Sequence, residues 1–156
     1  MFSQARSTGG DLLWDGDANG YVYGLKGGTA TNGFYRYDLD NNTWESRTVT
    51  GLPTLSYDTK AKIVGNYIYL LQGNSTNFFR YDTTDDGGGW IARTGTPNTV
   101  SNGAALAYDS GVHSDYIFAT RGAGTNSIYA YSIINNNWKT FDPTDLPSGA
   151  NVNIGG

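Results

Sequence analysis

Residues 20–28 read GYVYGLKGG, and the same pattern returns in NYIYLLQGN at residues 66–74 and in DYIFATRGA at residues 115–123. Each segment contains a turn residue, an aromatic-aliphatic-aromatic triplet, and a long polar residue followed by glycine. Tyr21, Tyr67 and Tyr116 mark the pattern at spacings of 46 and 49 residues. The chain is therefore expected to consist of three structural repeats.

Two further marks follow each of these segments in the same order. The first is an aromatic run that ends at a tryptophan: FYRYDLDNNTW at 34–44, FFRYDTTDDGGGW at 78–90 and IYAYSIINNNW at 128–138. The second is a proline that closes each unit, namely Pro53, Pro97 and Pro147. Three independent marks with one period make a chance match very improbable, so the repeat guides the rest of the interpretation.

Each unit predicts four short strands joined by turns rich in Gly, Asn and Asp, residues that accept the backbone angles of tight hairpins. The first strands are expected at residues 11–15, 61–65 and 103–109. The second strands are the tyrosine-rich runs, the third carry FYRYD at 34–38 and its equivalents, and the fourth begin at the tryptophans. The first and second strands are apolar on both faces, which predicts that similar sheets cover them on both sides. We therefore expect an all-β fold of three four-stranded antiparallel β-propeller blades.

The repeats resemble the kelch repeat, whose blades have a second strand ending in Gly-Gly, a Tyr-Asp on the third strand and a Trp at the fourth. Gly27-Gly28, Tyr37-Asp38, Trp44 and Leu52-Pro53 carry the resemblance. The later units depart from it at Gly73-Asn74, Gly122-Ala123 and Tyr131-Ser132. The resemblance is to bacterial or archaeal kelch-like repeats related to galactose oxidase propellers, and it implies a fold more strongly than a function.

The chain is interpreted as a single propeller segment, residues 1–156, with blades at 9–53, 57–97 and 101–147. Residues 1–8 resemble the fourth strand of a preceding unit, and residues 149–156 resemble the first strand of a following one. Three blades leave apolar faces uncovered, so further blades of a longer chain or copies of this chain are the expected partners. Copies would form a closed ring or an open filament.

The composition removes several classes of function. The chain has no Cys, a single His at position 113, ten Lys and Arg residues, and a net charge of -4. Thiol catalysis, zinc sites and a copper site of the galactose oxidase type lack their ligands, and there is no basic patch for nucleic acid. We expect no catalytic residues and no membrane insertion. The absence of Cys, with abundant Asn, Thr, Gly and Tyr, favours an extracellular or cell-surface location.

One loop has the residue types of a calcium site. Asp15, Asp17 and Asn19 place oxygen ligands at alternate positions before Gly20, as calcium loops do. The bidentate Glu of an EF-hand is missing, because Lys26 occupies its position. The alternative is a polar hairpin in which Asp and Asn bind their own backbone. Ca²⁺ is the only cofactor that the sequence suggests.

A second candidate site comes from one repeat position. Lys26, Gln72 and Arg121 stand just before the glycines that end the second strands. They could line one rim of an axial channel and bind a ligand there. In the alternative interpretation each side chain binds a carboxylate or carbonyl of the adjacent blade and fixes the packing of the blades.

The sequence thus favours a non-enzymatic extracellular module that acts through protein–protein contact or self-assembly. The alternative is a carbohydrate-binding propeller, in which calcium assists. Most aromatics recur at repeat positions and are expected in the core, whereas Trp14 is the exception available for stacking on a sugar. A fragment of a galactose oxidase-like or sialidase-like enzyme is the third interpretation.

Overall fold

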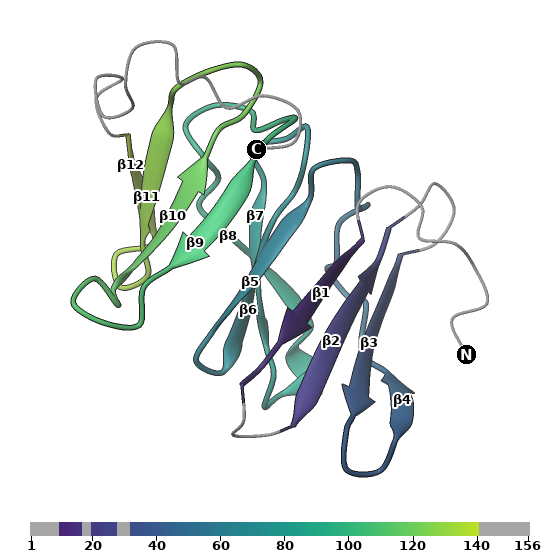
Figure 1. The fold of residues 1–156 in the computed structure, drawn as a ribbon. Coiled ribbons are helices and arrows are strands. Elements are labelled where there is room, and N and C mark those ends of the chain that lie inside the picture. Colours follow the sequence, from purple (N-terminus) through teal and green to yellow (C-terminus); the bar gives the residue numbers. More distant parts are fainter. Residues whose placement is uncertain (1–9, 17–19, 28–31, 141–156) are drawn as a thin grey trace.

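The computed structural model describes residues 10–16, 20–27 and 32–140, and within them the chain forms three four-stranded antiparallel sheets (Figure 1). Sheet 1 contains β1 (Asp11–Trp14), β2 (Tyr21–Lys26), β3 (Gly33–Asp38) and β4 (Thr43–Ser46). Sheet 2 contains β5 (Lys60–Val64), β6 (Tyr67–Leu71), β7 (Phe78–Asp82) and β8 (Trp90–Arg93). Sheet 3 contains β9 (Ala105–Tyr108), β10 (Tyr116–Thr120), β11 (Ile128–Ser132) and β12 (Asn137–Thr140). The predicted all-β fold of four-stranded units is confirmed. The partial strands expected at 1–8 and 149–156 lie outside the described residues.

Tight turns set the register of the strands in each sheet. Val64 pairs with Tyr67 across a two-residue turn, where Gly65 adopts a φ of 56°. This positive φ favours glycine because it has no Cβ. The tyrosine of each third strand lies directly opposite the tryptophan of the fourth, in the pairs Tyr37–Trp44, Tyr81–Trp90 and Tyr131–Trp138. The repeat in the sequence is therefore a repeat in cross-strand pairing.

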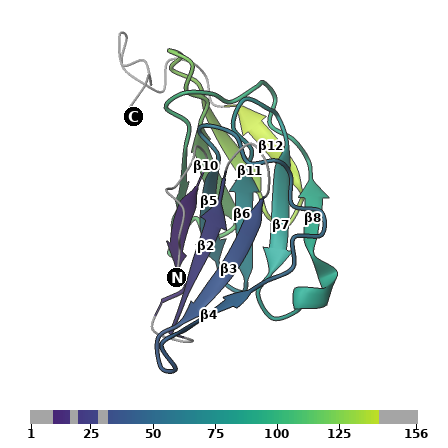
Figure 2. The same cartoon turned by 90° about the vertical axis from the view of Figure 1, so that its right-hand side faces the viewer.

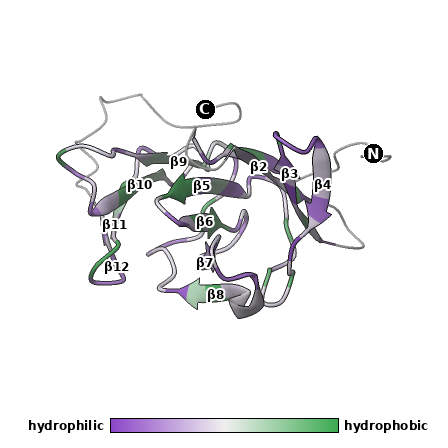
Figure 3. Ribbon diagram, turned by 90° about the horizontal axis from the view of Figure 1, so that it is seen from below, coloured by the Kyte–Doolittle hydropathy of each residue, from purple (hydrophilic) through white to green (hydrophobic). Residues whose placement is uncertain are grey.

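The sheets stack face to face, with sheet 2 between the other two (Figures 1 and 2). We call the face of a sheet that points toward the next sheet in the chain its forward face, and the opposite face its rear face. One core lies between sheets 1 and 2 and a second between sheets 2 and 3. Residues 68–71 of β6 are completely buried because sheet 2 is covered on both sides. In Figure 3 hydrophobic residues are seen along β6 and β10 and in part of β5.

An aromatic contact joins each sheet to the next. Phe34 on the forward face of sheet 1 is packed edge-on against Tyr81 and Trp90 of sheet 2, with ring centroids 4.8 and 5.1 Å apart. We call the packed contact between two neighbouring sheets a joint. At the second joint, between sheets 2 and 3, Phe78 makes the same contact with Tyr131 and Trp138, at 4.8 and 5.0 Å. Each such ring pair adds about 0.5–1.5 kcal/mol beyond the burial of its apolar area.

At the outer end of each joint, a set of hydrogen bonds that we call the latch connects the two sheets. The Asp86 Oδ1 atom accepts hydrogen bonds from the Tyr81 hydroxyl at 2.5 Å and from the backbone N–H of Thr48 in sheet 1's outgoing segment at 3.0 Å. The Arg47 Nε atom lies 3.3 Å from the same oxygen. At the second joint the latch consists of Tyr131, Asn136 and the N–H of Thr94. Burial and the bond to Asp86 raise the pKa of Tyr81 to about 12, so it remains a donor at ordinary pH.

The two latches predict different responses to acid. Burial opposes the ionisation of Asp86, but the bonds from Tyr81 and Thr48 and the charge of Arg47 outweigh it and lower its pKa below 3.8. A carboxylate with a lowered pKa in the folded state stabilises the fold above its unfolded pKa, and this stabilisation is lost as the pH falls through the folded value. Asp86→Asn should therefore lower the free energy of unfolding by about 1 kcal/mol at neutral pH and by less as the pH falls toward 2.

Urea unfolding monitored by tryptophan fluorescence at both pH values measures the difference. The control is Asn136→Asp, which adds a carboxylate to the second latch and should introduce the acid dependence there. An Asp86→Asn effect of equal size at both pH values would show that the ionised latch is not the cause.

Candidate functional site

A groove runs along the first strands of the three sheets. β5 lies against β1 on one side and β9 on the other, and all three are edge strands of their own sheets. The groove has a volume of about 570 Å³ and is lined by residues 11–14 of β1, residues 60–63 of β5 and residues 104–106 at the start of β9. Because the groove follows the innermost strands, all three sheets contribute residues to its lining.

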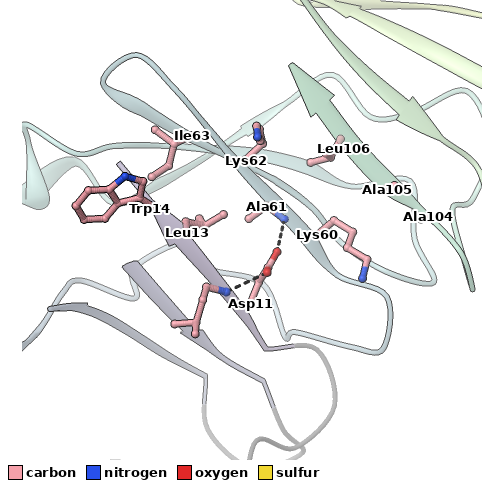
Figure 4. Close-up of a pocket in the computed structure, with 11 residues that line it drawn as sticks. Asp11, Leu13, Trp14, Lys60, Ala61, Lys62, Ile63, Ala104, Ala105 and Leu106 are labelled. Carbon is pink, nitrogen blue, oxygen red and sulfur yellow. Dashed lines mark hydrogen bonds between the residues drawn. The ribbon is translucent and has the colours of Figure 1, made fainter. Parts of the chain in front are cut away.

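The floor of the groove is fixed by Asp11. Its Oδ2 atom accepts the backbone N–H of Ala61 at 3.0 Å, which connects β1 to the open edge of β5 (Figure 4). Its Oδ1 atom accepts the N–H of Leu12 at 2.9 Å. The carboxylate thus supplies an acceptor for a strand-edge donor that has no strand partner, and it holds sheets 1 and 2 at a set distance.

The walls of the groove combine positive charge with an exposed aromatic ring. Lys60 and Lys62 alternate along β5 and are both half-buried, and neither forms an ion pair within the described residues. Trp14 lies toward the opposite end of the groove from Lys60 and is 48 % exposed (Figure 4). Two ammonium groups and an indole face form a surface suited to a ligand that carries both a carboxylate and a flat apolar face.

The three residues expected at a channel rim do not line this groove. The Gln72 Nε2 atom donates to the Thr54 carbonyl at 2.8 Å, and the Arg121 Nε atom donates to the Thr99 carbonyl at 3.3 Å. Both carbonyls belong to the segment that enters the donor's own sheet from the preceding one. Lys26 ends β2 opposite Gly33, and its side chain has no hydrogen-bond or ion-pair partner among the described residues. Gln72 and Arg121 therefore bind carbonyls, as the packing alternative expects, but these carbonyls lie in the linkers before the donor's own sheet and not on the adjacent blade.

The candidate calcium loop is described only in part. The Asp15 Oδ1 atom accepts the N–H of Tyr21 at 3.0 Å and so closes the β1–β2 hairpin. Its second carboxylate oxygen is buried without a hydrogen-bond partner. Asp17 and Asn19 lie outside the described residues. In the part of the chain that the structure describes, no three His, Cys, Asp or Glu side chains are grouped as a metal site would require.

The arginines that a sialidase would gather around one substrate lie on separate sheets. The Arg36 guanidinium stacks over the Tyr21 ring at 4.1 Å, and that of Arg80 stacks over the Tyr67 ring at 4.2 Å. Arg36 also binds Glu45 on the neighbouring strand, with its Nη2 atom 2.5 Å from the carboxylate. These contacts explain the arginines as stabilising elements of two equivalent forward faces.

Sequence reasoning missed the groove and its lysines. Lys60 and Lys62 occupy alternate positions of a strand that reads as apolar, and this alternation was the available signal that one face of β5 reaches solvent. Asp11 gave no signal, because its partner Ala61 is distant in sequence and is brought to it only by the stacking of the sheets.

Comparison with models of protein families finds no match to this chain, and no curated protein matches it either. The described residues contain no helix with the length and apolar character needed to cross a membrane. The fold defines the class: an all-β protein of three stacked four-stranded antiparallel sheets, an arrangement compatible with a β-propeller.

Substitutions of the charged residues in the groove should change the free energy of unfolding by different amounts. Asp11→Ala should lower the free energy of unfolding by about 1.5–3 kcal/mol, because the N–H of Ala61 loses a charged acceptor. Lys62→Ala should change it by less than about 0.5 kcal/mol, because the ammonium has no partner among the described residues. Urea denaturation of both variants measures these values. Equal costs for the two would mean that Lys62, too, has a structural role.

Proposed function

We propose that this chain is a non-enzymatic, extracellular kelch-like propeller module that acts through protein–protein contact and assembles with copies of itself. Its stacked sheets form a rigid scaffold, and the loops and outer faces carry recognition. The kelch-like marks in the sequence and the three equivalent sheets support the family part of this proposal. The absence of cysteine and the single histidine support a role in binding over one in catalysis, because few groups are present to activate a nucleophile.

The single observation that carries the proposal is the construction of the outer faces. The rear face of sheet 1 holds the same Tyr–Trp pair that sheets 2 and 3 pack against their neighbours. Trp90 of sheet 2 is 5 % exposed and Trp138 of sheet 3 is partly buried, whereas Trp44 is 38 % exposed. An apolar face built like a buried joint and left accessible is typical of an interaction surface.

A second candidate function is carbohydrate binding, and the groove favours it. Trp14 offers an exposed indole of the kind that stacks on a sugar ring, and the two lysines that line the same groove suit an acidic sugar. Calcium bound through Asp15, Asp17 and Asn19 would assist by ordering the loop that follows Trp14.

Self-assembly predicts a native mass above that of one chain. Light scattering should give at least twice 16.8 kDa, because apolar sheet faces associate when they are not covered. A dimer corresponds to a closed ring of six blades, whereas very large particles correspond to a filament. A monodisperse 16.8 kDa species at every concentration would contradict the assembly.

Carbohydrate binding predicts retention of uronic-acid oligosaccharides on a glycan array. Trp14→Ala should weaken binding at least about tenfold, since stacking on the indole is lost. Trp44→Ala, which removes another exposed tryptophan outside the groove, is the matched control and should bind normally. The array is run in calcium and in chelator, and binding confined to calcium would support the metal-assisted form. An array blank in both conditions would exclude this alternative.

A further inference from the structure

We propose that the forward face of sheet 3 binds the rear face of sheet 1 of a second copy, head to tail. This inference rests on the proposed self-assembly and names its two surfaces. The contact is heterologous, because different patches of the two copies meet. Its template is present twice within the chain, at the joints between sheets 1 and 2 and between sheets 2 and 3.

The rear face of sheet 1 is a complete receiving face. Tyr37 and Trp44 lie with ring centroids 4.9 Å apart, and the equivalent pair Tyr131–Trp138 lies at 5.1 Å. In sheet 3 that pair accepts Phe78 from the preceding sheet. The Oδ1 atom of Asn42 already accepts the Tyr37 hydroxyl, as Asn136 does for Tyr131. The aromatic pair and half of the latch are therefore in place on sheet 1.

The forward face of sheet 3 offers the matching part. Its register places Ile128 at the position of Phe78 in sheet 2, because Ile128 pairs with Thr120 as Phe78 pairs with Leu71. Ile128 is apolar and half-buried. Beside it lies a hollow of about 350 Å³ lined by His113, Tyr116, Phe118, Ala130 and Lys139. In sheets 1 and 2 the position of Ala130 carries an arginine, so sheet 3 presents a less filled face than the internal joints do.

The sizes of the side chains on the innermost strands favour this particular pairing. At the joint between sheets 1 and 2, a large forward residue, Leu13, packs with a small rear residue, Ala61. By register the equivalent forward residue in sheet 3 is Ala107, and the equivalent rear residue in sheet 1 is Leu12. Relative to the first joint the large and small partners are exchanged, whereas the second joint has Lys62 and Leu106 at the equivalent positions.

The neighbouring position strengthens the match. Trp14 on the rear face of sheet 1 stands where sheet 2 has Ile63, and it is larger. Leu12 and Trp14 are 54 % and 48 % exposed, and Ala107 is exposed as well. A bulky, accessible rear face and a small, accessible forward face are complementary in shape, as well-packed interfaces require. A face meant for solvent would not need large apolar residues at these positions.

The test uses one variant that disables each face. Trp14→Asp places a charge on the rear face, and Ile128→Asp places one on the forward face. For each variant alone, the protein concentration at which half of the chains are assembled should rise at least about 100-fold, because the contact would bury an unpaired carboxylate. Ile134→Asp is the matched control: Ile134 is 73 % exposed in the β11–β12 turn, off both faces, so the variant should assemble as the native chain does. Ala107→Asp is a second forward-face variant at an exposed position, in case Ile128→Asp unfolds.

Mixing the two variants separates this inference from other modes of assembly. The Trp14→Asp chain keeps its forward face and the Ile128→Asp chain keeps its rear face, so the mixture should form a 1:1 complex that neither forms alone in sedimentation velocity. Failure of the mixture to associate, while the native chain does, would overturn the head-to-tail contact and leave self-assembly standing. A native chain that stays monomeric would overturn both.

Discussion

The stack depends on one contact: a phenylalanine of each sheet packed edge-on against a tyrosine and a tryptophan of the next. Phe34 and Phe78 make it with ring separations of 4.8–5.1 Å. The contact requires that the tyrosine and tryptophan lie opposite each other on adjacent strands, which in turn fixes the register of the third and fourth strands. The latches act at the periphery of the same joints. Register within a sheet and packing between sheets are thus set by the same side chains.

The fold was predictable because every unit repeats its strand and turn signals. The first strands expected at 11–15 and 61–65 are observed at Asp11–Trp14 and Lys60–Val64. The prediction that the second strands are covered on both faces is correct for β6 of sheet 2. In sheet 3, β10 is buried on one face and only partly covered on the other. A strand's sequence shows that it can be covered on both sides. Whether another sheet is there to cover it depends on the assembly.

The candidate site was less predictable, because it is formed by residues that the sequence keeps apart. The hydrogen bond between Asp11 and Ala61 and the placement of Lys60 and Trp14 in one groove follow from how the sheets stack, for which a repeat gives no distances. The positions that the repeat did single out, Gln72 and Arg121, bind nearby carbonyls. Equivalent positions in a repeat share a structural environment first, and their contacts are often those that hold the repeat together. Lone departures such as Trp14 and Ala130 show where one sheet differs from the other two.

The order of strands within each sheet follows the order of the chain, with every ladder joining neighbours in sequence. Closing a short loop costs little entropy, so each sheet can form from its own hairpins before the next sheet is complete. Sheets 1 and 3 have no strand in common and no shared ladder. Pulling one end of the chain would consequently peel away a single terminal sheet, and the remaining pair would keep its joint. Resistance to a pulling force therefore comes from the joints, which would break one after another, and not from one contact that holds the whole fold.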